Sequence, residues 1–289
     1  MILTRCAKIR SVQHATNNQS GLPSAPSDLR LVRPRRGAII RHTAEDALSA
    51  LRGGAWDDEG RFVKSENDDF TYLGLLTIAG VATPVALKQF VARPGFLGAL
   101  RSAGPRRRAR RQWRGAEQLQ RLGVPTSPPI LLATGRFQGR VCDWLLLRHV
   151  PGEDLLHHLH RGELSVREEH DAARKTGDLV ASIDSVGWFN RDSKLSNLIR
   201  TPEGVITAID TVDIQRRPGR RVRMLRAMLS EAMGSELTPR RALMMRCLKE
   251  AVEDPKGAWR ELEKYAATSR DLTPKTSVLR PLDEDNTES

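Results

Sequence analysis

Between residues 61 and 150, short apolar segments alternate with tight turns on both sides of one long basic segment. The apolar segments have the lengths and residue types of β-strands, and the turns are rich in Gly, Pro, Asn and Asp. The basic segment is interpreted as a helix, because Gly123 and Pro125 behind it are helix stop signals. The pattern predicts three strands, a helix and two strands: RFVK, FTYLGLLTI, VALKQFV, the helix RRRARRQWRGAEQLQRL, and two strands within PPILLATGRFQGRVCDWLLLRHV. Short turns between consecutive strands predict an antiparallel sheet.

Helical patterns dominate the rest of the chain. Apolar and small residues between Val166 and Val186 recur at helical spacing, and Gly187 ends this amphipathic helix. The stretch WFNRDSKLSNLIR follows, and VITAID then forms a strand that reaches Asp210. Further helices are predicted near residues 221–234, 239–252 and 257–267. The fold class is therefore α+β, with an antiparallel N-terminal lobe that has one helix and a small, mainly α-helical C-terminal lobe.

Composition sets the expected boundaries. A basic, Ser- and Pro-rich arm comes first and an acidic, polar tail comes last, and both are predicted to be disordered. The divisions are 1–37 for the arm, 38–150 for the N-terminal lobe, 151–270 for the C-terminal lobe and 271–289 for the tail. The arm lacks the apolar core of a secretory signal, so a transit peptide and a plain arm both stay open.

Hydropathy and cysteine usage exclude other classes. No apolar run approaches the roughly 18 residues that cross a bilayer, so we expect a cytoplasmic protein without a transmembrane helix. The three cysteines Cys6, Cys142 and Cys247 are widely spaced and odd in number. They fit a reducing compartment and neither a disulfide framework nor a zinc site.

The net charge of +12 is concentrated in two arginine clusters. One cluster lies in the predicted basic helix and the other follows Asp210: Arg106, Arg107, Arg108, Arg110, Arg111 and Arg114, and Arg216, Arg217, Arg220, Arg221, Arg223 and Arg226. Such clusters favour an anionic partner, although a solvated face explains either one equally well. A nucleic-acid module would rest on these clusters alone, without a known motif and with only 4% aromatic residues, so no nucleic acid is expected.

Five polar residues have the types and the order that phosphoryl transfer from ATP requires. Asp192 could accept the hydrogen bond of an attacking hydroxyl, and Lys194 could steady the γ-phosphate. Asn197 offers a hard oxygen to Mg²⁺, and Asp210 at a strand end offers a bridging carboxylate. Lys88, in the strand VALKQFV, could pair with the α- and β-phosphates.

With these motifs the chain resembles the protein-kinase-like superfamily from about residue 62 to residue 252. NRDSKLSN stands where that superfamily has H-R-D-x-K-x-x-N, IDTVD where it has the D-F-G aspartate, and VALK where it has V-A-I-K. RRQWRGAEQLQRLGVPTSPPI, PGEDLL and the small helical C-terminal part look most like bacterial kinases of the lipopolysaccharide core, which act on heptose or Kdo. The resemblance implies a two-lobed fold with ATP in the cleft. It also implies a saccharide or glycolipid acceptor, and peripheral contact with the inner face of the cytoplasmic membrane.

Several positions depart from the superfamily's pattern. Asn190 replaces the usual His, which we expect to remove a hydrogen-bonding scaffold, and the turn SENDDFTYLG has no glycine-rich motif. The helix residue that pairs with Lys88 stays open: alignment by eye places Gln112 where an acid is expected, while Glu117 lies about 140° further around the helix. DTV in place of D-F-G keeps the metal ligand but has no Phe for an activity switch.

Two main functions stay open. The first is a kinase for a saccharide or glycolipid hydroxyl, with Arg216, Arg217, Arg220 and Arg221 lining the acceptor side. The second is a pseudokinase, a nucleotide-binding or interaction module whose catalysis has eroded. Protein substrates are not expected, because only about ten residues separate Asp210 from the next helix and no A-P-E motif is present.

Two weaker candidates complete the set. Asp213 could be a second metal or substrate contact, or simply a turn cap. The histidines near the lobe junction could bind a metal, but structural or incidental roles are favoured because acidic and cysteine ligands are missing beside them: His149, His157, His158 and His160.

Overall fold

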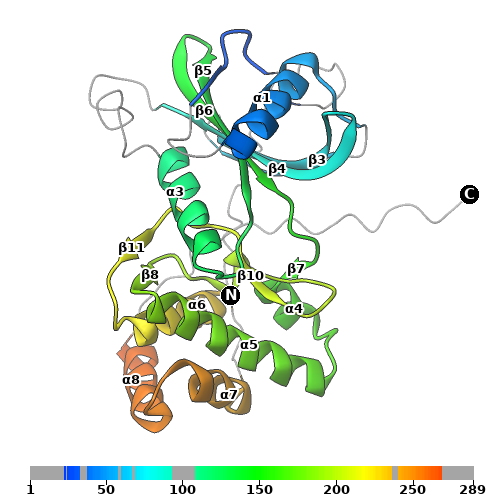
Figure 1. Cartoon of the computed structure of the whole chain (residues 1–289). Coiled ribbons are helices and arrows are strands. Elements are labelled where there is room, and N and C mark those ends of the chain that lie inside the picture. The colour runs from blue at the N-terminus through cyan, green and yellow to red at the C-terminus, as the bar shows by residue number, and fades with distance from the viewer. Residues whose placement is uncertain are drawn as a thin grey trace, which may run out of the picture.

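The computed structural model describes residues 23, 25–32, 38–57, 60–66, 69–92, 108–235 and 240–268. A six-stranded sheet forms the N-terminal part, and the C-terminal part is built mainly from helices (Figure 1). The elements of the N-terminal part are β1 (Arg30–Leu31), α1 (Ala38–Gly53), β2 (Arg61–Glu66), β3 (Asp69–Ile78), β4 (Val81–Val91), α3 (Arg108–Arg121), β5 (Pro129–Phe137) and β6 (Arg140–Arg148). The elements of the C-terminal part are β7 (Glu153–Asp154), α4 (Leu155–Arg161), α5 (Val166–Ser185), β8 (Trp188–Asn190), the short 3₁₀ helix η2 (Leu195–Asn197), β9 (Leu198–Arg200), β10 (Ile206–Ala208), β11 (Ile214–Arg216), α6 (Arg221–Gly234), α7 (Arg241–Ala251) and α8 (Pro255–Thr268).

The sheet has the strand order β1-β5-β6-β4-β3-β2, and every neighbouring pair is antiparallel. The strands and the basic helix predicted between residues 61 and 150 are confirmed in kind and order. The turn after β3 is shorter than predicted, because residues 81–84 continue β4 in register with β3. Ala79 and Gly80 alone make this turn, and both have positive φ, 51° and 79°, as favoured hairpin turns require.

The start of the chain differs from the predicted disordered arm. Strand β1 pairs with β5 at the sheet edge, and Leu29 beside it is fully buried. Helix α1, which the sequence pattern did not predict, packs on the sheet, so the N-terminal part has two helices instead of one. The prediction of disorder over residues 1–37 is thus wrong for residues 25–32. Residues 1–22 and the predicted tail, 271–289, lie outside the described residues.

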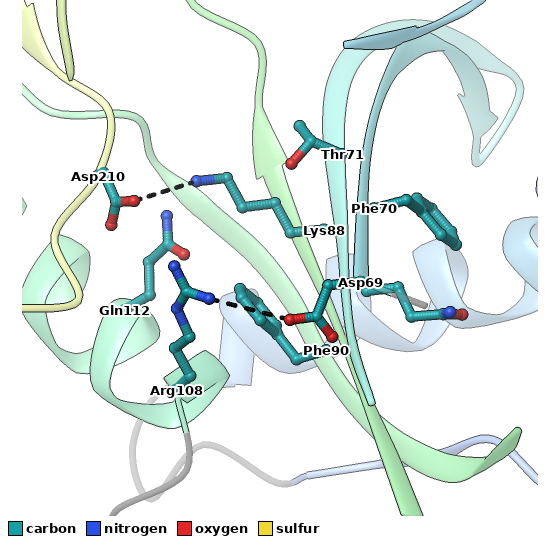
Figure 2. Close-up of a pocket in the computed structure, with 9 residues that line it drawn as sticks. Asp69, Phe70, Thr71, Lys88, Phe90, Arg108, Gln112 and Asp210 are labelled. Carbon is teal, nitrogen blue, oxygen red and sulfur yellow. Dashed lines mark ion pairs between the residues drawn. The ribbon is translucent and has the colours of Figure 1, made fainter. Parts of the chain in front are cut away.

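Alternation along β4 sends successive side chains to opposite faces of the sheet. Val85 and Leu87 are fully buried on the face that α1 covers. Ala86 and Phe90 pack on the other face, in the cluster that includes Trp113 of α3. Lys88 has the same parity as Ala86 and Phe90, so it points toward α3 and the C-terminal part (Figure 2).

The C-terminal part is organised around α5, whose apolar residues contribute to one core with α6, α7 and α8. The three helices predicted after Asp210 are confirmed as α6, α7 and α8. Two small antiparallel sheets, β10-β9-β7 and β11-β8, were not predicted beyond the strand before Asp210. Among the described residues, no helix is both long enough and apolar enough to span a bilayer.

The two parts are tied together by the segment that joins α3 to β5. The Thr126 hydroxyl donates to the carbonyl of Ala208 in β10 at 2.9 Å, and the two residues form a parallel bridge. The Ser127 hydroxyl donates to the Arg148 carbonyl at 2.6 Å, at the end of β6. This segment therefore holds the six-stranded sheet next to β10, the strand that leads to Asp210.

Candidate active site

The loop between β8 and β9 brings together Asp192, Lys194 and Asn197. The Lys194 ammonium lies 2.9 Å from Asp192 Oδ1. The Asn197 amide nitrogen Nδ2 donates to the Asp192 carbonyl at 3.0 Å and lies 3.3 Å from Asp192 Oδ2. Because Nδ2 is used as a donor within the loop, the Oδ1 atom of Asn197 is the one suited to a cation.

Backbone turns give the loop its shape. The Lys194 amide donates to the Asp192 carbonyl at 2.9 Å, and the Asn197 amide donates to the Lys194 carbonyl at 3.1 Å. Glu231 of α6 accepts from the Ser196 amide at 2.9 Å and from its hydroxyl at 2.5 Å. Sequence reasoning did not identify Glu231, because a single Glu within a helix pattern does not reveal a partner 35 positions away.

Asn190 joins the loop to the segment that carries Asp210. Its Oδ1 accepts from the Asp192 amide at 3.1 Å, and its Nδ2 donates to the Asp210 carbonyl at 3.3 Å. The residue is 1% exposed. The expectation that Asn190 removes a hydrogen-bonding scaffold is therefore wrong, because an amide can donate and accept at the same time.

Lys88 and Asp210 meet where the two parts of the molecule face each other. The Lys88 ammonium is 3.9 Å from Asp210 Oδ2, and their side chains are 16% and 20% exposed (Figure 2). The other carboxylate oxygen of Asp210 accepts from the Val212 amide at 3.2 Å. The ladder places Lys88 beside Thr71 of β3 and Leu145 of β6. The five residues selected from the sequence thus form two groups, Lys88 with Asp210 and Asp192 with Lys194 and Asn197, which Asn190 connects.

Gln112, and not Glu117, lies beside Lys88 and Asp210. Gln112 points from α3 toward this pair (Figure 2), and it is fully buried. Its Nε2 donates to the Ile209 carbonyl at 3.2 Å, while Glu117 forms an ion pair with Arg121 at 2.7 Å. No hydrogen bond to the buried Oε1 of Gln112 comes from the described residues. An acidic partner from α3 is therefore replaced by a neutral amide.

A cavity of about 100 Å³ opens between β3, β4, α3 and Asp210. Its lining carries two positive and two negative side chains, and Arg108 lies 3.9 Å from Asp69 across it (Figure 2). The cavity is smaller than the roughly 300 to 1,000 Å³ of pockets that enclose a whole small molecule. The charges of its two positive and two negative side chains balance. Asp69 and Arg108 were not singled out for this site from the sequence, because their meeting depends on the docking of α3.

Two opposing effects act on the pKa of Lys194. Partial burial lowers it, while the hydrogen bond to Asp192 and the charges of Asp192, Glu231 and Asp210 raise it. The raising effects are larger in sum, so the pKa lies above its ordinary value. Lys194 is therefore a cation at neutral pH, as an interaction with phosphate requires.

The members of the arginine cluster after Asp210 have three kinds of environment. Arg221 donates to Asp184 at 2.7 Å and to the Ala251 carbonyl at 3.1 Å, so the prediction that it lines an acceptor site is wrong. Arg223 and Arg226 lie over aromatic rings of the C-terminal part. The remaining members are exposed: Arg216, Arg217 and Arg220. In the first cluster, Arg106 and Arg107 lie outside the described residues.

One group of side chains near α4 has the spacing of metal ligands. Glu153, His158 and Glu163 place ligand atoms within 4.8 Å of one another. Two of the three already have partners, since Glu153 lies 2.8 Å from His157 and Glu163 lies 3.3 Å from Arg161. The expectation that acidic ligands are missing beside these histidines is therefore wrong for His158. A cation would compete with Arg161 for Glu163 here.

Comparison with known proteins gives a distant structural likeness only. No protein-family model and no curated protein matches the chain. A structure of the bifunctional kinase-methyltransferase WbdD matches with a TM-score of 0.43 and 18% identity, over 69% of this chain and 42% of that one. A high-resolution crystal structure of WbdD gives 0.45 and 14%, over 72% and 50%. A co-crystal structure of WbdD with the kinase inhibitor LY294002 gives 0.42 and 17%, over 70% and 44%.

The chain spans half or less of the length of these WbdD structures. A likeness at this identity and TM-score does not establish an activity for the chain.

Proposed function

We propose that the chain has the two-lobed fold of the protein-kinase-like superfamily and is an ATP- and Mg²⁺-dependent phosphotransferase. The observation that carries the proposal is the contact between Lys88 and Asp210, whose charged groups lie 3.9 Å apart. Asp210 lies on a segment that Asn190 connects to the Asp192 loop by hydrogen bonds. Phosphoryl transfer needs a cation on the phosphates, hard oxygen ligands for the metal and a carboxylate for the acceptor hydroxyl. The support for this assignment is the Lys88–Asp210 contact together with the two hydrogen bonds of Asn190.

In the proposed reaction, an acceptor hydroxyl attacks the γ-phosphorus of ATP. A new bond forms between the acceptor oxygen and phosphorus, the bond to the β,γ-bridging oxygen breaks, and ADP leaves. Asp192 orients the hydroxyl and takes its proton, because its carboxylate lies at the loop surface, 34% exposed. Lys194, kept protonated by its neighbours, steadies the transferring group.

The residues present fit a hard divalent cation. Carboxylate and amide oxygens are the ligands that Mg²⁺ prefers, and the contact of Asp210 Oδ2 with Lys88 is a long one, at 3.9 Å. Asn197 and Asp210 would hold the ion, and the bound ion would neutralise charge on the phosphates. Lys88 would then turn from Asp210 to the α- and β-phosphates, in the small cavity beside Gln112.

The acceptor that we propose is an anionic saccharide or glycolipid, with peripheral contact at the inner membrane surface and a cytoplasmic location. The support is the resemblance in sequence and the exposed arginines that follow Asp210, namely Arg216, Arg217 and Arg220. Guanidinium groups bind carboxylates and phosphates through paired hydrogen bonds.

A pseudokinase is the second candidate, and the neutral Gln112 favours it. A buried amide that hydrogen-bonds Ile209 cannot hold Lys88 as a carboxylate would. As a pseudokinase, the chain binds nucleotide or a partner without turnover. Metal-dependent transfer of phosphate from ATP separates the two functions.

The test is the unfolding temperature with and without Mg²⁺ and ATP, measured beside transfer of labelled phosphate to a membrane or glycolipid extract. Ligand at 100 times its Kd stabilises a folded protein by about 2.7 kcal/mol. Asp210→Asn should lose most of this stabilisation, since one metal ligand becomes neutral. Asp178→Asn, which removes a surface carboxylate paired with Arg174 on α5, should keep it. An equal shift in both variants would contradict the metal assignment, and binding without transfer would favour the pseudokinase.

A further inference from the structure

Asp213 receives two arginines from different elements. Arg111 of α3 approaches its Oδ1 at 3.3 Å, and Arg191, the residue before Asp192, approaches its Oδ2 at 3.5 Å. The Asp213 side chain is 20% exposed, whereas those of Arg111 and Arg191 are 46% and 61% exposed. Each carboxylate oxygen already has a cationic partner, so this residue is a poor candidate for a second metal ligand or a direct substrate contact.

The same stretch of chain holds α3 in further ways. Gln112 donates to the Ile209 carbonyl at 3.2 Å, and the Thr211 hydroxyl donates to the Gln112 carbonyl at 2.8 Å. On the other side, the Arg191 amide donates to the Asp213 carbonyl at 3.2 Å, next to the pairing of β8 with β11. Residues 209–213 therefore lie between α3 and the loop that carries Asp192.

We propose that Asp213 is a positioning residue, which sets α3 and the Asp192 loop in their relative places through its two arginine contacts. The proposal rests on the phosphotransferase function proposed above. Lys88 and Gln112 stand at the phosphate end of the site, and Asp192 stands at the acceptor end. A single carboxylate that contacts both sides fixes the distance over which the phosphoryl group moves.

Charge explains why a neutral residue cannot replace Asp213. Without its carboxylate, Arg111 and Arg191 would face each other as like charges, and both side chains can swing into solvent because they are exposed. The helix and the loop would stay linked through residues 209–213 by the hydrogen bonds of Gln112, Thr211 and Asn190, but they would lose the side-chain link that the Asp213 carboxylate provides. Small misplacements of reacting groups are costly, since an error of about 1 Å lowers a rate by roughly a hundredfold.

The experiment compares Asp213→Ala and Asp213→Glu with the full-length protein, using kcat and KM for ATP together with the unfolding temperature. We expect Asp213→Ala to lower kcat by roughly tenfold to a hundredfold with a smaller change in KM. The unfolding temperature should change little, because exposed ion pairs contribute little to stability. Asp213→Glu and added acetate, which supplies a carboxylate to the two arginines, should each restore part of kcat. Asp178→Asn on α5 removes a comparable surface ion pair and should leave kcat unchanged.

Two outcomes would overturn the proposal. One is an unchanged kcat in Asp213→Ala; the other is a decrease of kcat that parallels a large fall in unfolding temperature and that neither Glu nor acetate repairs. If the parent protein transfers no phosphate, the phosphotransferase function fails, and hydrogen exchange then decides on Asp213 alone. Faster exchange in both α3 and residues 188–198 of Asp213→Ala, and not of Asp178→Asn, supports the positioning role. Unchanged exchange in these segments contradicts it.

Discussion

At the scale of single residues, the site divides into contacts that sequence spacing predicts and contacts that it does not. Asp192, Lys194 and Asn197 lie within six positions, so a tight loop must bring them together, and it does. The replacement of the usual His by Asn190 is expected to remove a hydrogen-bonding scaffold, yet its side-chain amide accepts from the Asp192 amide and donates to the Asp210 carbonyl. The Asp192 amide is a local partner two positions away, but the Asp210 carbonyl becomes a partner only once β8 and the segment after β10 are adjacent.

The residue on which the proposed chemistry depends most is Asp192. Asp192→Asn should lower phosphate transfer by roughly a hundredfold or more while nucleotide binding stays nearly intact, because orienting and basic groups act mainly in the transition state. Single-turnover transfer and nucleotide titration measure the two quantities separately. Parallel decreases in binding and rate would indicate a folding defect instead.

At the scale of elements, α3 shows what periodicity predicts and what it leaves out. The predicted helix RRRARRQWRGAEQLQRL corresponds to α3, Arg108–Arg121, because Gly123 and Pro125 mark its end. Its docking could not be predicted, since its partners, residues 209–213, are distant in the sequence; Gln112 and Thr211 are 99 positions apart. The close packing of α3 on residues 209–213 requires a glycine at position 115, because a Cβ there would come within 2.3 Å of the Thr211 carbonyl oxygen.

Gly115→Ala should therefore push α3 away from residues 209–213. We expect the free energy of unfolding to fall by about 1 to 3 kcal/mol, and the transfer rate to fall because Gln112 and Arg111 move with the helix. Gly234→Ala in α6 is the matched control, since a Cβ there meets nothing within 4 Å and Ala favours a helix over Gly by up to about 1 kcal/mol. Urea unfolding of both variants makes the measurement. Equal free energies of unfolding for the two variants would contradict this prediction, because they would show that α3 and residues 209–213 can move apart without loss of stability.

At the scale of the whole molecule, the strands between residues 61 and 150, α3, α5 and the last three helices are predictable because they are strongly patterned. Helix α1 and most strands of the two small sheets were not predicted. β1 could not be predicted, because two residues carry no periodicity, although the buried Leu29 beside it anchors that edge. The second arginine cluster looks like one surface in the sequence, but the fold uses Arg221 inside the C-terminal part and leaves Arg216 and Arg217 exposed. Only tertiary packing separates structural arginines from those available to a partner.

These two exposed arginines give the prediction for the acceptor. Replacing Arg216 and Arg217 by Ala should weaken acceptor binding by about 1.5 to 3 kcal/mol for each charge-assisted hydrogen bond that the substitutions remove, with little change in ATP affinity. Salt should reproduce part of this weakening, because exposed charges are screened beyond roughly 8 Å at physiological ionic strength. The control replaces two exposed arginines elsewhere by Ala, Arg167 on α5 and Arg260 on α8. This control variant has the same net charge as the variant without Arg216 and Arg217. Acceptor titrations across salt concentrations make the comparison, and an equal weakening in both double variants would assign the effect to net charge alone.

The side-chain amide of Asn190 has one more consequence, which concerns how the Asp192 and Asp210 segments move relative to each other. Its two hydrogen bonds give the Asp192 backbone and the Asp210 backbone a common origin, and the amide between them is planar and short. We therefore expect a displacement of Asn190 to carry the Asp192 backbone and the Asp210 backbone in the same direction. Two separate supports would let these segments move independently. In the function proposed above, this shared support would keep the acceptor end and the metal end of the site in register.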